Sequence, residues 1–291
     1  MGSRILVLLA LSGVLLFTQC TDLGDSGSIV VHIADVPPVE QDITGIYVTI
    51  TDVEYRKADG IWQDGALFDD PIQVNLLDLS NGVTALLGEY PALAGNYEAI
   101  RFVLEAPVEG QGASDKSYVQ FANGSTEPLY LASLSDRTAV ATGNFTVPFN
   151  GSAEVVADFN TRTALVHTQG ENLYVWNPNP RVSESVRLGS LEGTLTEFAP
   201  EGSYTVAYAY SKGTFSEAEL ADVEMPFPNA FSADVVESDE FILASLPIGV
   251  YDIYLVSFNS DGKVHRVEGE VQTIVVDAGS VTQVDIDGNN L

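Results

Sequence analysis

Cysteine, methionine, tryptophan, histidine and basic side chains are all scarce in this chain of 291 residues. It has one Cys, two Met, two Trp and three His, and only 12 Lys and Arg against 41 Asp and Glu. A single cysteine excludes internal disulfides and paired-cysteine metal sites. The net charge of −29 disfavours nucleic acid as a partner, because its phosphates would be repelled. Cationic ligands are compatible with this charge, but an acidic surface chiefly keeps an exposed protein soluble.

Long apolar runs are also missing. A transmembrane helix needs about 20 apolar residues, and the longest run here, from Ile5 to Phe17, has 13. It follows a short positively charged start that ends at Arg4, and this order of segments is typical of an export signal. We therefore expect the rest of the chain to lie outside the membrane.

The only cysteine lies directly behind this apolar run. The sequence Leu16-Phe17-Thr18-Gln19-Cys20 resembles a lipobox, in which the cysteine thiol receives diacylglycerol, although Gln19 stands where Gly, Ala or Ser is usual. An ordinary signal peptidase site is the alternative, but a lone exported thiol without a disulfide partner favours lipidation. We predict a signal peptide over residues 1–19, then a lipidated Cys20 with a flexible spacer over residues 20–26.

Most of the remaining chain has the pattern of β-strands. Abundant Val and Thr, with 12 Tyr and 13 Phe, favour strands, and apolar residues alternate with polar ones between turn residues. The period changes once, where Leu79, Val83, Leu86 and Leu87 have helical spacing, so we predict one short helix over Ser80–Leu87. The fold class expected is all-β, with two β-sandwich domains. The expected strands are 28–33, 43–54, 71–76, 97–105, 119–121, 129–131, 145–149, 153–159 and 173–176, then 191–195, 204–210, 241–244, 251–258, 265–267, 271–276 and 281–286.

The two halves share one phrase. Leu93 to Ile100 and Leu246 to Ile253 each place a glycine two residues before a tyrosine at the start of a long strand. We expect the glycine to permit a tight turn, and the tyrosine ring to pack while its hydroxyl reaches the backbone. The echo fits two sandwiches of related type.

Six phrases carry a family resemblance in the first half. They are Ala34-Asp35-Val36-Pro37, Ile46 to Glu54, Asn75 to Gly88, Leu93 to Arg101, Asp158 to Arg162 and Asn179 to Val182. With them the chain resembles an uncharacterised lipoprotein domain family, common in Bacteroidetes, which implies a β domain over residues 27–188 and assigns no catalytic residue. Residues 189–291 resemble a transthyretin-like or carboxypeptidase-regulatory-like sandwich, a type that acts as a spacer or recognition module.

No pattern of polar residues indicates catalysis. The histidines, His32, His167 and His265, stand outside metal-binding and nucleophile motifs, and Asp285 to Asn289 opens like a calcium loop but lacks the closing glutamate. We expect no metal site, no cofactor and no enzymatic activity. Aromatic residues near predicted loops are candidates for a glycan-binding face, although core positions explain each of them more readily: Trp62, Tyr90, Tyr130, Tyr174 and Trp176.

The sequence therefore predicts a lipoprotein of the cell envelope, anchored through Cys20 to the outer membrane and exposed at the surface, which binds or adheres to a glycan or protein ligand. A structural subunit or anchor of a fimbria-like assembly, joined by strand addition, is the alternative. A carbohydrate-active hydrolase is the third hypothesis, and no spacing of acidic residues selects a catalytic pair for it.

Overall fold

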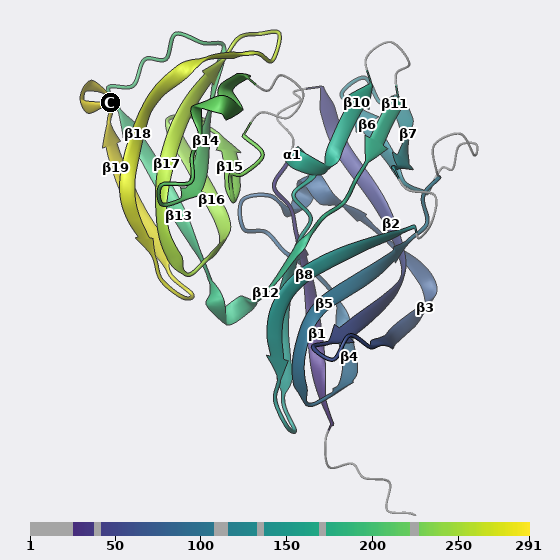
Figure 1. Cartoon of the computed structure of the whole chain (residues 1–291). Helices are drawn as coiled ribbons and strands as arrows, with labels where there is room; N and C mark the ends of the chain where they lie inside the picture. Colours follow the sequence, from purple (N-terminus) through teal and green to yellow (C-terminus); the bar gives the residue numbers. More distant parts are fainter. Residues whose placement is uncertain (1–25, 38–41, 108–115, 133–136, 169–172, 222–226) are drawn as a thin grey trace, which may run out of the picture.

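A computed structural model describes residues 26–37, 42–107, 116–132, 137–168, 173–221 and 227–291. Its regular structure is nearly all strand, which confirms the all-β prediction, and the strands form two lobes that lie side by side (Figure 1). We call residues 26–184 the first lobe and residues 188–291 the second lobe. Among the described residues, no helix has the length and apolar character needed to cross a membrane.

The first lobe is one continuous, curled sheet of twelve strands. Along the hydrogen-bonded path the order is β10-β11-β7-β6-β2-β5-β8-β12-β9-β1-β4, and β3 pairs with β2. A single turn of helix, α1 (Thr161–Ala164), follows β9. The strands are β1 (Ser26–Ala34), β2 (Ile43–Lys57), β3 (Trp62–Asn75), β4 (Ala85–Leu93), β5 (Gly95–Leu104), β6 (Tyr118–Phe121), β7 (Thr126–Leu131), β8 (Thr138–Val147), β9 (Ser152–Asp158), β10 (Leu165–Thr168), β11 (Leu173–Trp176) and β12 (Arg181–Glu184).

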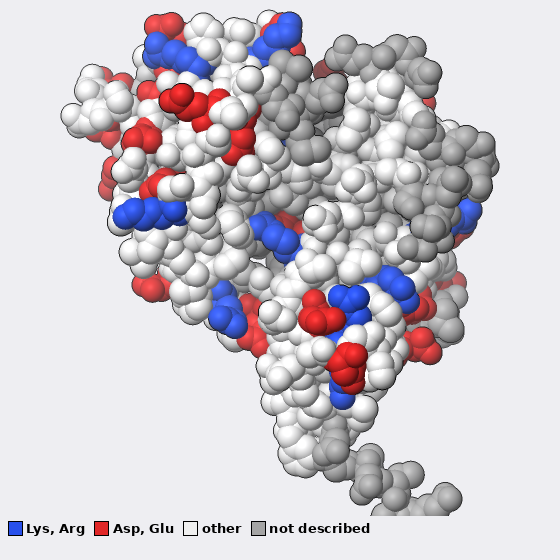
Figure 2. Space-filling model, viewed as in Figure 1, with Lys and Arg blue, Asp and Glu red and all other residues white. Residues whose placement is uncertain are grey.

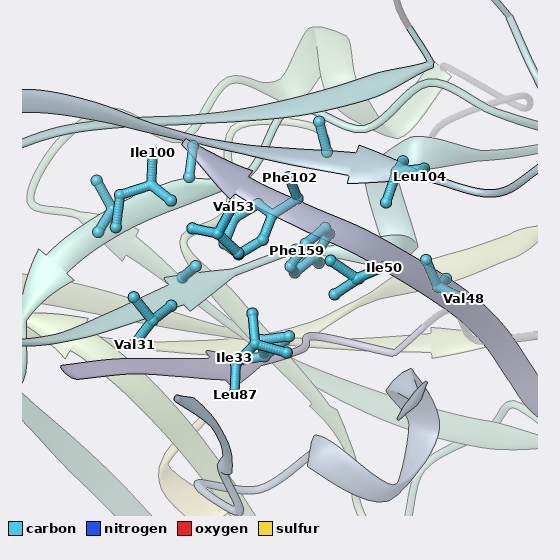
Figure 3. Close-up of a cluster of buried hydrophobic side chains, with 14 of the residues drawn as sticks. Val31, Ile33, Val48, Ile50, Val53, Leu87, Ile100, Phe102, Leu104 and Phe159 are labelled. Atoms are coloured by element: carbon cyan, nitrogen blue, oxygen red, sulfur yellow. The ribbon is translucent and has the colours of Figure 1, made fainter. Parts of the chain in front are cut away.

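The long strand β2 organises the core of this lobe. Val48 and Ile50 point inward from its first half, and after an irregularity between Ile50 and Asp52 the inward positions shift by one residue to Val53 and Tyr55. A bulge of this kind bends a strand and changes which side chains face inward. Figure 3 shows the resulting cluster, in which side chains of β2 meet those of β1, β4 and β5 and the ring of Phe159.

The second lobe consists of two stacked sheets. One has the order β16-β13-β19 and the other β15-β14-β17-β18. The four-stranded sheet is buried on both faces, because Ala207 and Ala209 face the inter-sheet core whereas Tyr208 and Tyr210 lie in a separate cluster on its other side. The strands are β13 (Leu188–Thr196), β14 (Tyr204–Ser211), β15 (Ser232–Val235), β16 (Glu240–Pro247), β17 (Gly249–Phe258), β18 (Val264–Val276) and β19 (Val281–Asp287).

The helix predicted over Ser80–Leu87 is wrong. A 3-10 turn, η2 (Leu76–Leu79), precedes this segment, and its last residues already belong to β4. Asn81 and Gly82 have φ angles of 55° and 82°, and this left-handed pair breaks any helix there. Among the described residues of this lobe, the one α-helix is α1 instead. The strand predictions hold for most elements, but β4, β10, β12 and β15 were not predicted as strands, and residues 265–267 and 271–276 form one strand, β18.

The tyrosines of the shared phrase take the same place in both lobes, as predicted. Tyr97 is buried and donates its hydroxyl to the Leu93 carbonyl over 2.7 Å, and Tyr251 is buried and donates to the Pro247 carbonyl over 2.7 Å. Each hydroxyl thus fixes the turn four residues before it. Gly95 has a φ of 141°, which favours glycine.

Candidate functional site: the junction between the lobes

The lobes meet where three segments of the first lobe reach one turn of the second. The segments are residues 34–37 after β1, residues 158–162 at the start of α1, and Arg181 at the start of β12. The turn comprises residues 227–231, before β15. We call this meeting place the junction. Basic and acidic side chains lie together in the seam between the lobes, where the junction reaches the surface (Figure 2).

A buried carboxyl group, Asp35, holds the first-lobe side of the junction together. Its Oδ1 accepts from the Thr161 backbone N–H over 2.8 Å, and its Oδ2 lies 2.5 Å from the Thr161 hydroxyl. The backbone adds two links, from Phe159 N–H to the Ala34 carbonyl and from Arg162 N–H to the Val36 carbonyl. Burial raises the pKa of Asp35 to about 8, with a smaller contribution from the nearby Asp158 charge, although the Thr161 hydrogen bonds act in the opposite direction.

Arg162 reaches from α1 into the second lobe. Its guanidinium donates to the Phe227 carbonyl over 2.9 Å and to the Ala230 carbonyl over 3.3 Å, and its Cζ lies 5.6 Å from the centre of the Tyr208 ring. Burial lowers the pKa of this guanidinium, but arginine keeps its charge at neutral pH. The carbonyls at the two ends of the 227–230 turn are therefore held by one planar cation.

Arg181 makes a second, parallel link. Its Nη2 donates to Asp158 Oδ2 over 2.7 Å and to the Phe231 carbonyl over 2.8 Å, and its Cζ lies 4.6 Å from the centre of the Phe231 ring. Asp158 is buried and belongs to the first lobe, and with Arg181 it forms a hydrogen-bonded ion pair. Through the Phe231 carbonyl, Arg181 also binds the second lobe. Stacking on the Phe231 ring and hydrogen bonding to the Phe231 carbonyl together fix the orientation of the Arg181 guanidinium against the second lobe.

A third contact lies at the turn that replaced the predicted helix. The Asn81 side chain hydrogen-bonds to Asp234 on β15, and burial raises the pKa of Asp234 to about 6. A Cβ placed at Gly82 would lie 3.4 Å from the Ala244 Cβ on β16. The loop between η2 and β4 therefore packs closely against the second lobe.

Two hollows among the described residues do not have the form of catalytic sites. One, of about 20 Å³, lies at the junction and has a single carboxylate, Asp158, which Arg181 already holds. The other, of about 210 Å³, is lined by residues around Trp176, and Arg137 is the charged side chain among its described lining residues. Neither brings together the two carboxylates that glycoside cleavage requires. Within the described residues, no group of three or more His, Cys, Asp or Glu side chains is placed to hold a metal ion.

The region that carries the junction matches a sequence family described as "Domain of unknown function (DUF4382)", over residues 26–178. The chain belongs to this family. The prediction of an uncharacterised domain in the first half is confirmed, and DUF4382 includes Asp35, Asp158 and Arg162 but ends just before Arg181. A comparison with curated proteins gave no match.

Several solved structures show weak similarity to this DUF4382 chain. The Bacillus anthracis TIE protein is 10% identical with a TM-score of 0.21, over 90% of this chain and 34% of its own length. The major pilin subunit BcpA of Bacillus cereus is 8% identical with a TM-score of 0.23, over 90% and 70%. The fimbrial anchor protein Mfa2 from Porphyromonas gingivalis is 9% identical with a TM-score of 0.20, over 84% and 82%. TM-scores this low do not establish a shared fold.

The residues singled out from the sequence do not converge. Cys20 lies outside the described residues. His32 Nε2 lies 3.1 Å from Glu154, His167 stacks on Tyr174, and His265 lies 3.6 Å from Glu201, so each histidine has a separate local partner. In the calcium-like tail, Asp287 accepts from the Asn289 backbone N–H over 3.0 Å and caps a terminal 3-10 turn, η5 (Gly288–Asn290).

The aromatic candidates are divided between core and surface. Tyr90, Tyr174 and Trp176 are buried, which agrees with the core interpretation. Trp62 is half-buried, and the Arg101 and Arg56 guanidinium carbons lie 4.3 Å and 5.0 Å from its ring centre. Tyr130 is also half-buried. These five aromatics do not form one glycan-binding face.

Sequence reasoning did not identify the junction. Its residues had been noted only as family phrases, and four of the six phrases meet there: those of Asp35, Asn81, Arg162 and Arg181. Because these phrases are far apart in the sequence, the sequence alone did not indicate that all four contact the second lobe.

Proposed function

We propose that this protein is a Bacteroidetes-type lipoprotein, anchored in the outer membrane by acyl chains on Cys20, whose body is exposed at the cell surface and binds or adheres to a glycan or protein. The observation that carries the proposal is the position of the only cysteine, directly behind an apolar export segment and six residues before the folded body begins at Ser26. Several acyl chains hold such a body stably, at about 0.8 kcal/mol per buried methylene.

The body would consist of two domains, residues 27–188 and a transthyretin-like sandwich over residues 189–291. Every strand of the twelve-stranded sheet comes from before residue 185, and the strands of the other two sheets come from after residue 187, which supports this division. The junction would hold the two domains in one fixed orientation, and a fixed orientation suits a protein that presents a surface to a ligand.

A binding role is favoured over catalysis because the buried charged groups serve internal contacts. Asp35 binds Thr161, Arg162 binds backbone carbonyls, and Asp158 binds Arg181. Active sites usually direct such perturbed groups into a cleft. Here these groups are directed into the seam between the lobes, where their hydrogen bonds hold the backbone and side chains of the junction in place.

The alternative role, as a subunit or anchor of a fimbria-like assembly, has one observation in its favour. The strand β18 is 13 residues long and outermost in its sheet, so a further strand could pair along its free side. Three register irregularities against β17 and several exposed polar side chains on β18 oppose this, because bulges and charges protect edge strands from pairing. A lipid-free protein that stays monomeric at high concentration in light scattering would count against the assembly role.

The anchor is tested by mass spectrometry of the N-terminal peptide after expression in a bacterial host. The wild-type protein should begin at acylated Cys20 and fractionate with membranes, and protease treatment of intact cells should remove its body. Cys20→Ala should lack the acyl mass and leave the membrane fraction, whereas Thr21→Ala, a control one residue away, should behave as the wild type. An unacylated wild-type protein released into the medium would refute the proposed anchor. Glycan and protein ligand screens would follow on the anchored protein.

A further inference from the structure

One end of the first lobe consists of the turns that lie beside Ser26, the first residue of β1. We call it the tip, and define it as residues 26–28, 91–96 and 146–151. Ser26 pairs with Leu93, Gly95 pairs with Val147, and the Asn150 backbone N–H donates to the Ser26 carbonyl over 3.0 Å. The β4–β5 and β8–β9 turns therefore lie beside Ser26, the first residue of β1, at one end of the first lobe (Figure 1).

Large apolar side chains project from the tip into solvent. Phe149 is 59% exposed and lies in the turn between β8 and β9, and Leu93 is 48% exposed and is the last residue of β4. Nothing in the first lobe requires these residues to be apolar, because neither belongs to its core. An exposed phenylalanine and leucine at adjacent turns mark a contact surface for something outside the chain.

The tip is also uncharged in a strongly acidic protein. Residues 26–31, 90–97 and 138–153 contain no Asp, Glu, Lys or Arg, although 18% of the whole chain is charged. On the face shown in Figure 2, the described residues at the lower end of the first lobe are free of red and blue. The charges that border the tip are Glu89, which accepts from the Ser28 hydroxyl over 2.6 Å, Glu184, which accepts from the Thr146 backbone N–H over 2.9 Å, and Lys57, whose Nζ lies 3.8 Å from a Cβ placed at Gly95.

The length of the spacer limits how far the tip can lie from an anchored Cys20. Five residues lie between Cys20 and Ser26, so six residue-to-residue steps connect them, and a fully extended chain spans at most about 3.5 Å per step, or about 20 Å in all. The chain has a net charge of −29 and is repelled by an anionic lipid surface within a Debye length of about 8 Å. An uncharged end is the part that can approach that surface with least repulsion.

We infer that the tip rests on the lipid surface, with Phe149 and Leu93 inserted among the lipid headgroups. This inference rests on the proposed anchor at Cys20 and adds the orientation of the body. Aromatic and aliphatic side chains gain free energy on entering the membrane interface. The second lobe and the junction would then stand away from the membrane with the acidic surface.

The experiment uses the lipidated full-length protein in vesicles of phosphatidylethanolamine and phosphatidylglycerol. Acylation occupies the only native thiol, so Phe149→Cys or Leu93→Cys supplies one labelling site for an environment-sensitive fluorophore. Val275→Cys is the matched control, because Val275 is 52% exposed but lies on β18 of the second lobe. Doxyl-labelled lipid in the vesicles quenches only those fluorophores that reach the bilayer.

We expect the fluorophores at Phe149 and Leu93 to shift to shorter emission wavelengths and to be quenched several-fold more strongly than the one at Val275. If all three are quenched equally weakly while the N-terminal peptide is acylated, the tip does not contact lipid, although the anchor stands. If the peptide is unacylated and the protein does not bind vesicles, the anchor fails, and the orientation inferred from it fails as well.

Discussion

Replacing Asp35 by asparagine should remove a pH dependence of stability that the buried carboxyl group creates. Asparagine has the shape of the protonated acid and keeps an oxygen for the Thr161 backbone N–H. The Thr161 hydroxyl has one hydrogen, yet it lies 2.5 Å from Asp35 Oδ2 and 3.3 Å from the Val36 carbonyl. A protonated Asp35 can donate to this hydroxyl, which then donates to Val36, and the asparagine amide can do the same.

The sign of the effect follows from the raised pKa. The folded protein holds the Asp35 proton up to a pKa of about 8, whereas the unfolded chain releases it at an ordinary value of 3.8. Folding therefore retains a proton in this range, and the free energy of unfolding falls as pH rises from 3.8 to about 8. The slope is about 1.4 kcal/mol per pH unit for one proton, so the wild type should lose about 3 kcal/mol between about pH 6 and pH 9 through this group.

Urea unfolding at a series of pH values measures this directly, with the fluorescence of the buried Trp176 reporting on the first lobe. Because the unfolded wild type already releases this proton above 3.8, Asp35→Asn should have a higher free energy of unfolding than the wild type at pH 6, and the difference should grow by about 3 kcal/mol between pH 6 and pH 9. Asp277→Asn, an exposed control with the same charge change, should run parallel to the wild type. Parallel curves for Asp35→Asn as well would refute the assignment of a protonated, buried carboxyl group.

Three further predictions concern the junction, the shared phrase and the anchor. Arg162→Met should destabilise the protein by about 2–4 kcal/mol, because two buried carbonyls lose a charged donor. Calorimetry should show the two lobes of this variant unfolding in separate transitions, whereas the exposed control Arg187→Met should change little. A single, unchanged unfolding transition for Arg162→Met would contradict this prediction. Tyr97→Phe and Tyr251→Phe should each cost about 1 kcal/mol in urea unfolding, since each removes one hydroxyl hydrogen bond, and unchanged midpoints would show that these bonds add nothing. Gln19→Gly should raise the fraction of chains that begin at Cys20 in N-terminal mass spectra, and an unchanged fraction would show that residue 19 does not limit processing.

The strands were predictable because their side chains repeat with a strict local period, but the predicted helix shows where period alone fails. Leu79, Val83, Leu86 and Leu87 have helical spacing, yet Val83 is 54% and Leu86 is 64% exposed, while Leu79 and Leu87 are buried from different elements. The spacing was therefore a coincidence of two half-buried segments. Asn81-Gly82, a pair suited to left-handed backbone, was the local signal that should have prevailed.

The junction was only partly predictable. Strand β14 reads Tyr-Thr-Val-Ala-Tyr-Ala-Tyr with hardly a polar position, and β17 is similarly apolar. Strands that are apolar on both faces are covered on both faces, so the sequence does indicate that something packs against the outer face of this sheet. It does not indicate what, because the covering segment around Phe227 has no strand or helix period of its own, and Val36 comes from the other lobe.

The charges at the junction select one arrangement of the lobes more than they add stability. Burying charged groups costs solvation free energy, which good partners only offset, and apolar contacts such as Val36 on the Tyr208 cluster already favour association. Apolar contacts, however, are non-directional, so two apolar surfaces can shift along each other with little loss of free energy. Arg162 and Arg181 must each meet particular carbonyls, at Phe227, Ala230 and Phe231. A shift in register would leave the buried Arg162 without its carbonyl acceptors and would separate the half-buried Arg181 from the Phe231 carbonyl. We therefore expect Arg162→Met to widen the distribution of inter-lobe distances, measured between labelled sites in the two lobes, even under conditions where both lobes remain folded.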